Sequence, residues 1–198
     1  MRQKKSEQSI RSLLGDQNHQ AIVLHQPDEA TFRAQANKAQ PFKMTGLLDH
    51  FPLYRGLKAH STPYQQCDLL ASLAPKENIH YSIIPPKEQS YFGNCDDGSL
   101  NFSFSDNQTD LLSFCNLLKD YIKDPCLGSL YFQASPIKGL STHMSRLAVL
   151  DNAHSSMRHP NSWIGHSQKI TLHNDLNRNL IGMFAGTKKV TLFPPDLP

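Results

Sequence analysis

The sequence predicts an α+β fold, mainly β with flanking helices, in a single domain. Short strand-like runs bounded by glycine and proline recur along the chain, such as residues 79–84 before Pro85 and Pro86. One strongly amphipathic helix is expected at 110–123, where apolar residues recur at helical spacing. The length of 198 residues fits one ordinary domain and gives no reason to invoke two.

Short strands and helices alternate in the first half of the chain. The expected elements are a strand at 21–24, a helix from Asp28 to about residue 38, an extended run at 41–47, a turn at 49–54 and a helix at 64–73. Asp28 suits a helix start because its carboxylate can accept from the free N–H groups of the first turn. The second helix would turn Leu69, Leu70 and Leu73 inward.

The middle of the chain holds the helix at 110–123, which Thr109 or Asp110 can cap, and Pro125 lies just beyond its end. Upstream of it, Asp96 and Asp97 could suggest a metal site. They stand beside Gly98 in a hairpin-like setting, so we interpret them as turn residues.

Composition excludes several classes of protein. The formal charge of +3 is too small to indicate nucleic-acid binding, and the basic residues are spread out. The four cysteines lack the CxxC spacing of zinc ribbons and are interpreted as reduced thiols. No run approaches the roughly 18 apolar residues of a membrane span. We therefore expect a soluble, cytoplasmic protein with no membrane partner.

The last third of the chain concentrates metal-competent side chains. His173 and Asp175 are one residue apart, and in an extended chain both would lie on the same face. A neutral imidazole and a carboxylate supply two of the three ligands of a facial two-histidine, one-carboxylate site, which suits Fe(II). The sequence therefore predicts a metal pair here, with a third ligand from elsewhere.

A hairpin is expected after this pair, with strands at 179–185 and 188–193 joined by a turn at Gly186. Lys188 would share a face with Val190 and Leu192 and point toward an apolar interior. An ammonium there is costly unless an anion meets it, and a dicarboxylate would be such an anion. The alternative is an edge-strand lysine that reaches water. Asn179 could add an amide hydrogen bond to the same ligand.

These residues occur in an order that resembles a known family. The matching positions are Trp163, Gly165, His173, Asp175, Asn179, Gly186, Lys188 and the run LFPP at 192–195. The series is similar to the cupin-like branch of the Jumonji C (JmjC) oxygenases, the group that includes the factor inhibiting hypoxia-inducible factor. The resemblance implies a double-stranded β-helix (cupin or jelly roll), with the barrel formed from about residue 125 onward.

The resemblance also implies cofactors and roles. Fe(II) would be bound through His173 and Asp175, and the cosubstrate 2-oxoglutarate would be held by Lys188 and assisted by Asn179. The run at 130–133 resembles the strand from which relatives present a tyrosine to the cosubstrate. Tyr131 is thus a candidate donor to 2-oxoglutarate and Gln133 a candidate substrate contact. Tyr131 could equally be a core aromatic.

One position departs from the family pattern. Many relatives place a threonine three residues before the histidine, where this chain has Ile170, with Thr171 following. A shift of one residue in a strand turns a side chain to the opposite face. No cosubstrate role is therefore carried onto Thr171.

The second histidine of the family's site has no counterpart, because no histidine follows Asp175. His143, His154, His159 and His166 lack metal-pair spacing and are interpreted as loop histidines. We therefore expect a fragment whose closing strands are missing and which turns over little 2-oxoglutarate alone. An unpaired sheet edge would remain, through which copies of the chain could associate.

The leading hypothesis is an Fe(II)- and 2-oxoglutarate-dependent hydroxylase of the JmjC cupin-like class. The alternative is a non-catalytic cupin-like module that binds a partner or ligand without turnover. A metal-binding cupin with other chemistry is a third reading, but it leaves Lys188 and Asn179 unexplained. The substrate class stays open among protein side chains, RNA and small molecules.

Overall fold

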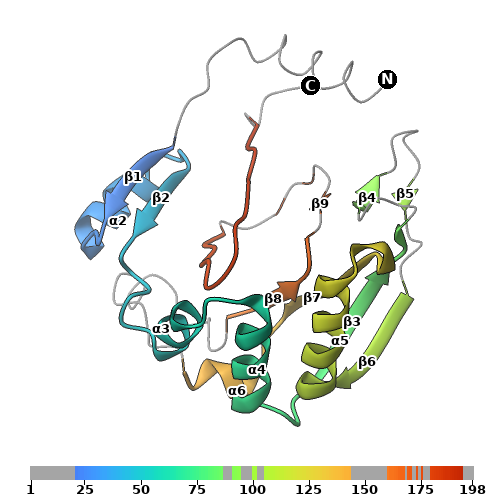
Figure 1. Ribbon diagram of the computed structural model, residues 1–198. Coiled ribbons are helices and arrows are strands. Elements are labelled where there is room, and N and C mark those ends of the chain that lie inside the picture. The colour runs from blue at the N-terminus through green and yellow to red at the C-terminus, as the bar shows by residue number, and fades with distance from the viewer. Residues whose placement is uncertain are drawn as a thin grey trace.

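The computed structural model describes most of the chain (Figure 1). The described residues are 21–86, 91–94, 100–101, 105–143, 160–167, 169–170, 173, 175 and 179–193. Several expectations lie outside them: the turn at Asp96 and Asp97, His154 and His159 as loop residues, the orientation of Thr171, and the closing prolines at 194–195.

A curled antiparallel sheet forms half of a barrel, in the strand order β6-β3-β7-β8. Its strands are β3 (Asn78–Ile84), β6 (Ser105–Asp110), β7 (Ser129–Ser135) and β8 (Ser162–Gly165). In the described part of the chain β6 and β8 are its edges. Association of copies through such an edge stays a prediction.

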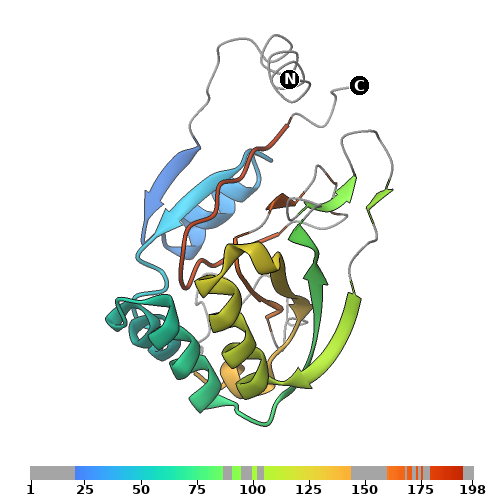
Figure 2. The ribbon, with the colours of Figure 1, turned by 45° about the vertical axis from the view of Figure 1, so that its right-hand side comes forward.

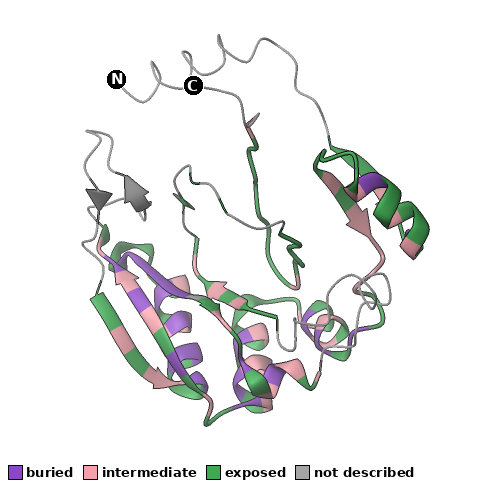
Figure 3. Cartoon of the chain, turned by 180° about the vertical axis from the view of Figure 1, so that it is seen from behind, coloured by how far each residue is buried: buried purple, intermediate pink, exposed green. Residues whose placement is uncertain are grey.

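Two helices cover one face of this sheet, α4 (Pro63–Leu73) and α5 (Leu111–Lys123), which lie side by side in Figure 2. An ion pair between Lys119 and Asp68 joins them at the surface. The core between helices and sheet includes Phe114, whose ring meets those of Tyr81 and Phe132 at centroid distances of 5.5 and 6.4 Å. Figure 3 shows the buried residues gathered in this part of the molecule.

Two smaller sheets complete the described fold. Strands β1 (Ile22–His25) and β2 (Phe42–Thr45) pair in parallel, and helix α2 (Glu29–Ala36) lies in the connection between them. Strand β4 (Tyr91–Asn94) pairs with β5 (Leu100–Asn101) and with β9 (Lys169–Ile170). The remaining elements are α3 (Pro52–Ala59), the 3-10 helix η2 (Pro125–Leu127) and α6 (Lys138–Ser141). Mainly β structure with flanking helices, as predicted, is confirmed.

The elements with strong local signals lie where the sequence predicted them. The Asp110 side chain accepts from the Ser113 backbone N–H at 2.7 Å and caps α5. Asp28 caps α2 in the same way, through Thr31 at 2.8 Å. Leu69, Leu70 and Leu73 of α4 pack against the core as expected, although the fully buried residues of this helix are Cys67 and Ala71.

The turn expected at 49–54 was wrong in its second half, because α3 begins at Pro52. Proline is favoured in the first turn of a helix, where its missing N–H costs nothing. Leu53 and Leu57, one turn apart, are 4% and 3% exposed and bring the helix onto the core. Burial of this pair explains why the segment continues as a helix.

The expected hairpin strands at 179–185 and 188–193 are also absent, since none of these described residues is assigned to a strand. The segment 179–193 runs as a largely exposed chain (Figure 3). A strand needs a backbone partner, and alternating apolar residues alone do not supply one. Only the bend at Ala185 and Gly186, with a positive φ of 74° at the glycine, matches the predicted turn.

Candidate metal and cosubstrate site

His173 and Asp175 lie next to each other, with the imidazole Nε2 3.9 Å from Oδ1 of the carboxylate. Their side chains are 57% and 56% exposed, so solvent reaches both. The short strand β9 places the chain just ahead of them, through the parallel partners Tyr91 and Lys169. The pairing of an imidazole with a carboxylate is therefore present, on an open surface.

The contact between these two side chains is compatible with one shared metal ion. Two donor atoms that each lie about 2.1 Å from the same ion are separated by at most about 4.2 Å. The 3.9 Å between Nε2 of His173 and Oδ1 of Asp175 is within that limit. A facial arrangement would bring the two atoms to about 3 Å, which half-exposed side chains reach by rotation. The donor set fits Fe(II).

Asn179 joins this pair through its side-chain amide, which donates from Nδ2 to Oδ2 of Asp175. In a continuous strand, residues four apart are separated by about 13 Å. Asn179 therefore lies closer to Asp175 than strand spacing would place it. The contact was not predicted, because the sequence suggested only that Asn179 faces a cosubstrate.

Tyr131 lies on β7 and is 3% exposed, so it is a buried aromatic. Its neighbour across the sheet is Gly165 of β8. A Cβ at Gly165 would lie 2.7 Å from the carbonyl oxygen of Leu130 and 2.9 Å from Cδ2 of Tyr131. Glycine is thus required there so that β8 can approach the tyrosine. Gln133 belongs to the same strand, and its side chain lies outside the described residues.

Lys188 is exposed, which corrects the expectation that it faces an apolar interior. Val190 and Leu192, the residues expected to line that interior, are 55% and 62% exposed. The reason is the missing strand pairing of 179–193, which leaves these residues without a facing layer in the described part of the chain.

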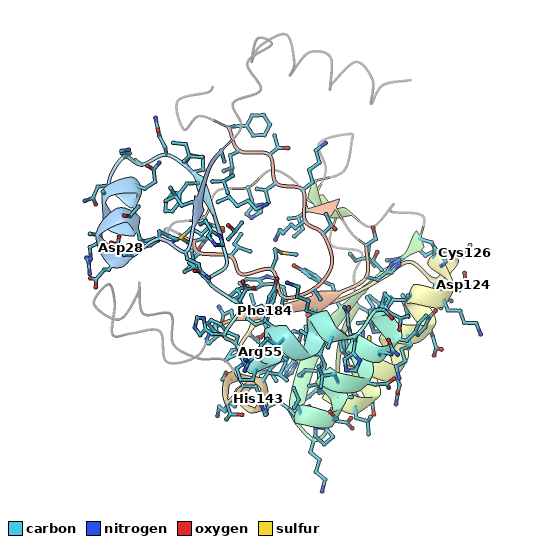
Figure 4. The ribbon with its side chains drawn as sticks, turned by 60° about the vertical axis from the view of Figure 1, so that its left-hand side comes forward. Asp28, Arg55, Asp124, Cys126, His143 and Phe184 are labelled. Atoms are coloured by element: carbon cyan, nitrogen blue, oxygen red, sulfur yellow. The ribbon has the colours of Figure 1, made fainter. Side chains whose placement is uncertain are left out.

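The segment 179–193 is nevertheless attached to the fold through Phe184, a contact that was not predicted (Figure 4). Its ring meets Phe51 and Tyr54 edge to face, at centroid distances of 6.0 and 6.1 Å. A Cβ at Gly182 would lie 3.8 Å from Leu48, so this stretch runs close to the end of β2. The available signal was a bulky aromatic just before Gly186.

Two of the histidines interpreted as loop residues, His143 and His166, are among the described residues. His143 ends the turn after α6, and its carbonyl oxygen accepts from the Leu53 N–H at 3.1 Å. The backbone N–H of His166 donates to Leu130 just beyond β8. Among the described residues no three His, Cys, Asp or Glu side chains gather as a metal-binding group. Over the same residues, no helix has the length and apolar character needed to cross a bilayer.

Comparison with known proteins gives the family. A family model described as a cupin-like domain matches residues 28–197, which include the half-barrel, the His173–Asp175 pair and the segment that carries Lys188. A search of curated proteins finds no match. Because the match spans most of the 198 residues, the chain belongs to the cupin-like domain family.

Proposed function

We propose that this cupin-like chain belongs to an Fe(II)- and 2-oxoglutarate-dependent oxygenase of the JmjC branch and supplies His173 and Asp175, two of the three ligands of its metal site. The observation that supports the proposal most directly is the 3.9 Å contact between His173 Nε2 and Asp175 Oδ1. Imidazole and carboxylate are ligands that Fe(II) accepts in facial sites. Membership of the cupin-like family supports the same reading.

In this proposal each residue has a separate task. His173 and Asp175 hold the ion, which when bound supplies the oxidation of 2-oxoglutarate by oxygen and the hydroxylation of a substrate. The Lys188 ammonium attracts a carboxylate of 2-oxoglutarate, since a fixed cation favours an anion near it. The Tyr131 hydroxyl donates a hydrogen bond to the cosubstrate, and Gln133 contacts the substrate. Asn179 assists in holding the cosubstrate through its side-chain amide.

Because Lys188 is exposed to water, its charge contributes only weakly to the binding of 2-oxoglutarate. A charge pair in water contributes little, about 1 kcal/mol or less. Strong binding of a dicarboxylate therefore requires that the metal takes the other end of the molecule. The proposal thus makes cosubstrate binding dependent on the metal.

Metal binding tests the proposal first. Mn(II) is titrated into the purified chain under anaerobic conditions, and binding is followed by the loss of the free-ion electron paramagnetic resonance signal. The chain is expected to bind the ion, and His173→Ala to abolish most of the binding. His80→Ala is the matched control, because His80 is an exposed histidine on β3. Equal binding by all three proteins would refute the assignment of the pair.

Turnover separates the oxygenase from the alternative, a cupin-like binding module. Loss of 2-oxoglutarate is measured with Fe(II) and oxygen, with candidate substrates that include a peptide, an RNA and small molecules. Turnover that disappears in Asp175→Ala supports the oxygenase. Because this chain alone is expected to turn over little 2-oxoglutarate, slow turnover by itself agrees with both hypotheses, and binding of a ligand that does not depend on the metal would favour the binding module.

A further inference from the structure

We infer that Asn179 is a positioning residue for the metal ligand Asp175, acting through the carboxylate and before any cosubstrate is bound. The inference rests on the proposed function, since it assumes that Asp175 binds a metal ion. It assigns to Asn179 a task different from contact with 2-oxoglutarate. The observation behind it is the hydrogen bond from Asn179 Nδ2 to Asp175 Oδ2.

The two oxygens of Asp175 have different neighbours. Oδ2 accepts from Asn179, whereas Oδ1 is the oxygen that lies 3.9 Å from Nε2 of His173. One oxygen is thus held by an amide and the other is presented toward the imidazole. A bound ion would therefore meet Oδ1, with the plane of the carboxylate already set.

The hydrogen bond from Asn179 matters because the Asp175 side chain is exposed. The Asp175 side chain is 56% exposed, so packing does little to fix its rotation. A hydrogen bond to a charged acceptor is roughly twice as strong as one between neutral groups. Groups that hold a ligand in this way commonly contribute about 10- to 100-fold to metal affinity. Asn179 is the described residue placed to do this for Asp175.

The position of Asn179 in the chain limits the movement of its side-chain amide. It is the first described residue of the segment 179–193, which is attached to α3 by the contacts of Phe184 with Phe51 and Tyr54. The attachment is five residues from Asn179 and limits how far the amide can move from Asp175. The metal pair is thereby linked to the core through this segment.

Mn(II) affinity without 2-oxoglutarate is the test, because a residue that only contacts the cosubstrate would not change it. Asn179→Ala and Asn179→Leu, the second of similar size but without a donor, are each expected to weaken Mn(II) binding by about 10- to 100-fold. Asn179→Gln keeps an amide donor on an exposed side chain and should recover most of the affinity. Asn161→Ala changes another exposed asparagine and should bind as the unsubstituted chain does.

The outcomes separate this inference from the proposed function. If His173→Ala abolishes Mn(II) binding but Asn179→Ala changes it less than twofold, the positioning role is overturned and the metal pair stands. If Asn179→Ala weakens only the binding of 2-oxoglutarate to the Mn(II)-loaded chain, Asn179 is a cosubstrate residue instead. If the unsubstituted chain binds no Mn(II), the proposed function fails, and the inference fails with it.

Discussion

The ring of Phe184 meets the ring of Phe51 edge to face, with centroids 6.0 Å apart and planes at 89°. Edge-to-face pairs at this spacing are favourable because the positive ring edge meets the negative face. Tyr54 forms a second such contact with Phe184. Together they attach the exposed segment 179–193 to α3, close to the end that begins with Asn179.

Phe184→Ala should detach this segment and destabilise the protein modestly. Phe184 is partly buried, so the loss is expected at about 1–2 kcal/mol, below the cost for a fully buried phenylalanine. Urea unfolding gives the stability, and limited proteolysis reports faster cleavage within 185–193. Leu192→Ala is the control, because Leu192 is 62% exposed. Equal proteolysis of the two variants would contradict the attachment.

A second prediction concerns the thiols between α4 and α5. Burial, with a smaller contribution from Cys67, raises the pKa of Cys115 from 9.0 to about 12. Above pH 9 the unfolded thiol ionises while the folded one stays protonated, so the unfolded state binds fewer protons. The stability supplied by Cys115 is therefore complete below pH 9 and declines by about 1 kcal/mol per pH unit up to the folded pKa.

Urea unfolding at neutral and alkaline pH checks this dependence against Cys115→Ala. The variant should lose less stability than the unsubstituted chain as the pH rises above 9. Native-state alkylation mapped by mass spectrometry gives an independent readout, in which the exposed Cys126 reacts while the buried Cys67 and Cys115 do not. Parallel pH profiles of the two proteins would show that the Cys115 thiol ionises as readily when folded.

A third prediction distinguishes Lys188 from its neighbour. In the metal-loaded chain Lys188→Ala should weaken 2-oxoglutarate binding several-fold and leave Mn(II) affinity unchanged, whereas Lys189→Ala should change neither. Both lysines are exposed, so the comparison controls for net charge. Calorimetric titration with 2-oxoglutarate measures the difference. Equal losses from the two substitutions would show that only the overall charge of the segment matters.

The sequence predicted those elements whose signal is local. Asp110 as a cap, the apolar face of α5 and the prolines after β3 each act within a few residues, and the structure has all three. The helix at Pro52–Ala59 was missed because its apolar pattern consists of one buried pair, Leu53 and Leu57, which is too short a repeat to indicate a helix. The strands predicted within 179–193 are absent because strand pairing depends on a partner far away in the sequence, which a local pattern does not reveal.

Within the candidate site, the sequence predicted the contact of one pair of residues and not the surroundings of the others. The spacing of His173 and Asp175 was enough to expect that they meet, and their side chains do lie 3.9 Å apart. The hydrogen bond from Asn179 to Asp175 joins residues that strand spacing would hold about 13 Å apart, so period-two alternation did not predict it. The bulky aromatic Phe184 suggested a contact, but its partners Phe51 and Tyr54 depend on where α3 packs, and the sequence of 179–193 does not contain that information.

The proposed function requires that 2-oxoglutarate binds to an ion held by His173 and Asp175. The most direct measurement is calorimetric titration of 2-oxoglutarate into the chain with and without Mn(II), repeated for His173→Ala. We expect 2-oxoglutarate to bind to the Mn(II)-loaded chain, and to bind little or not at all without the metal or in the variant. Equal affinity in all three cases would contradict it, because the cosubstrate would then be held without the metal pair.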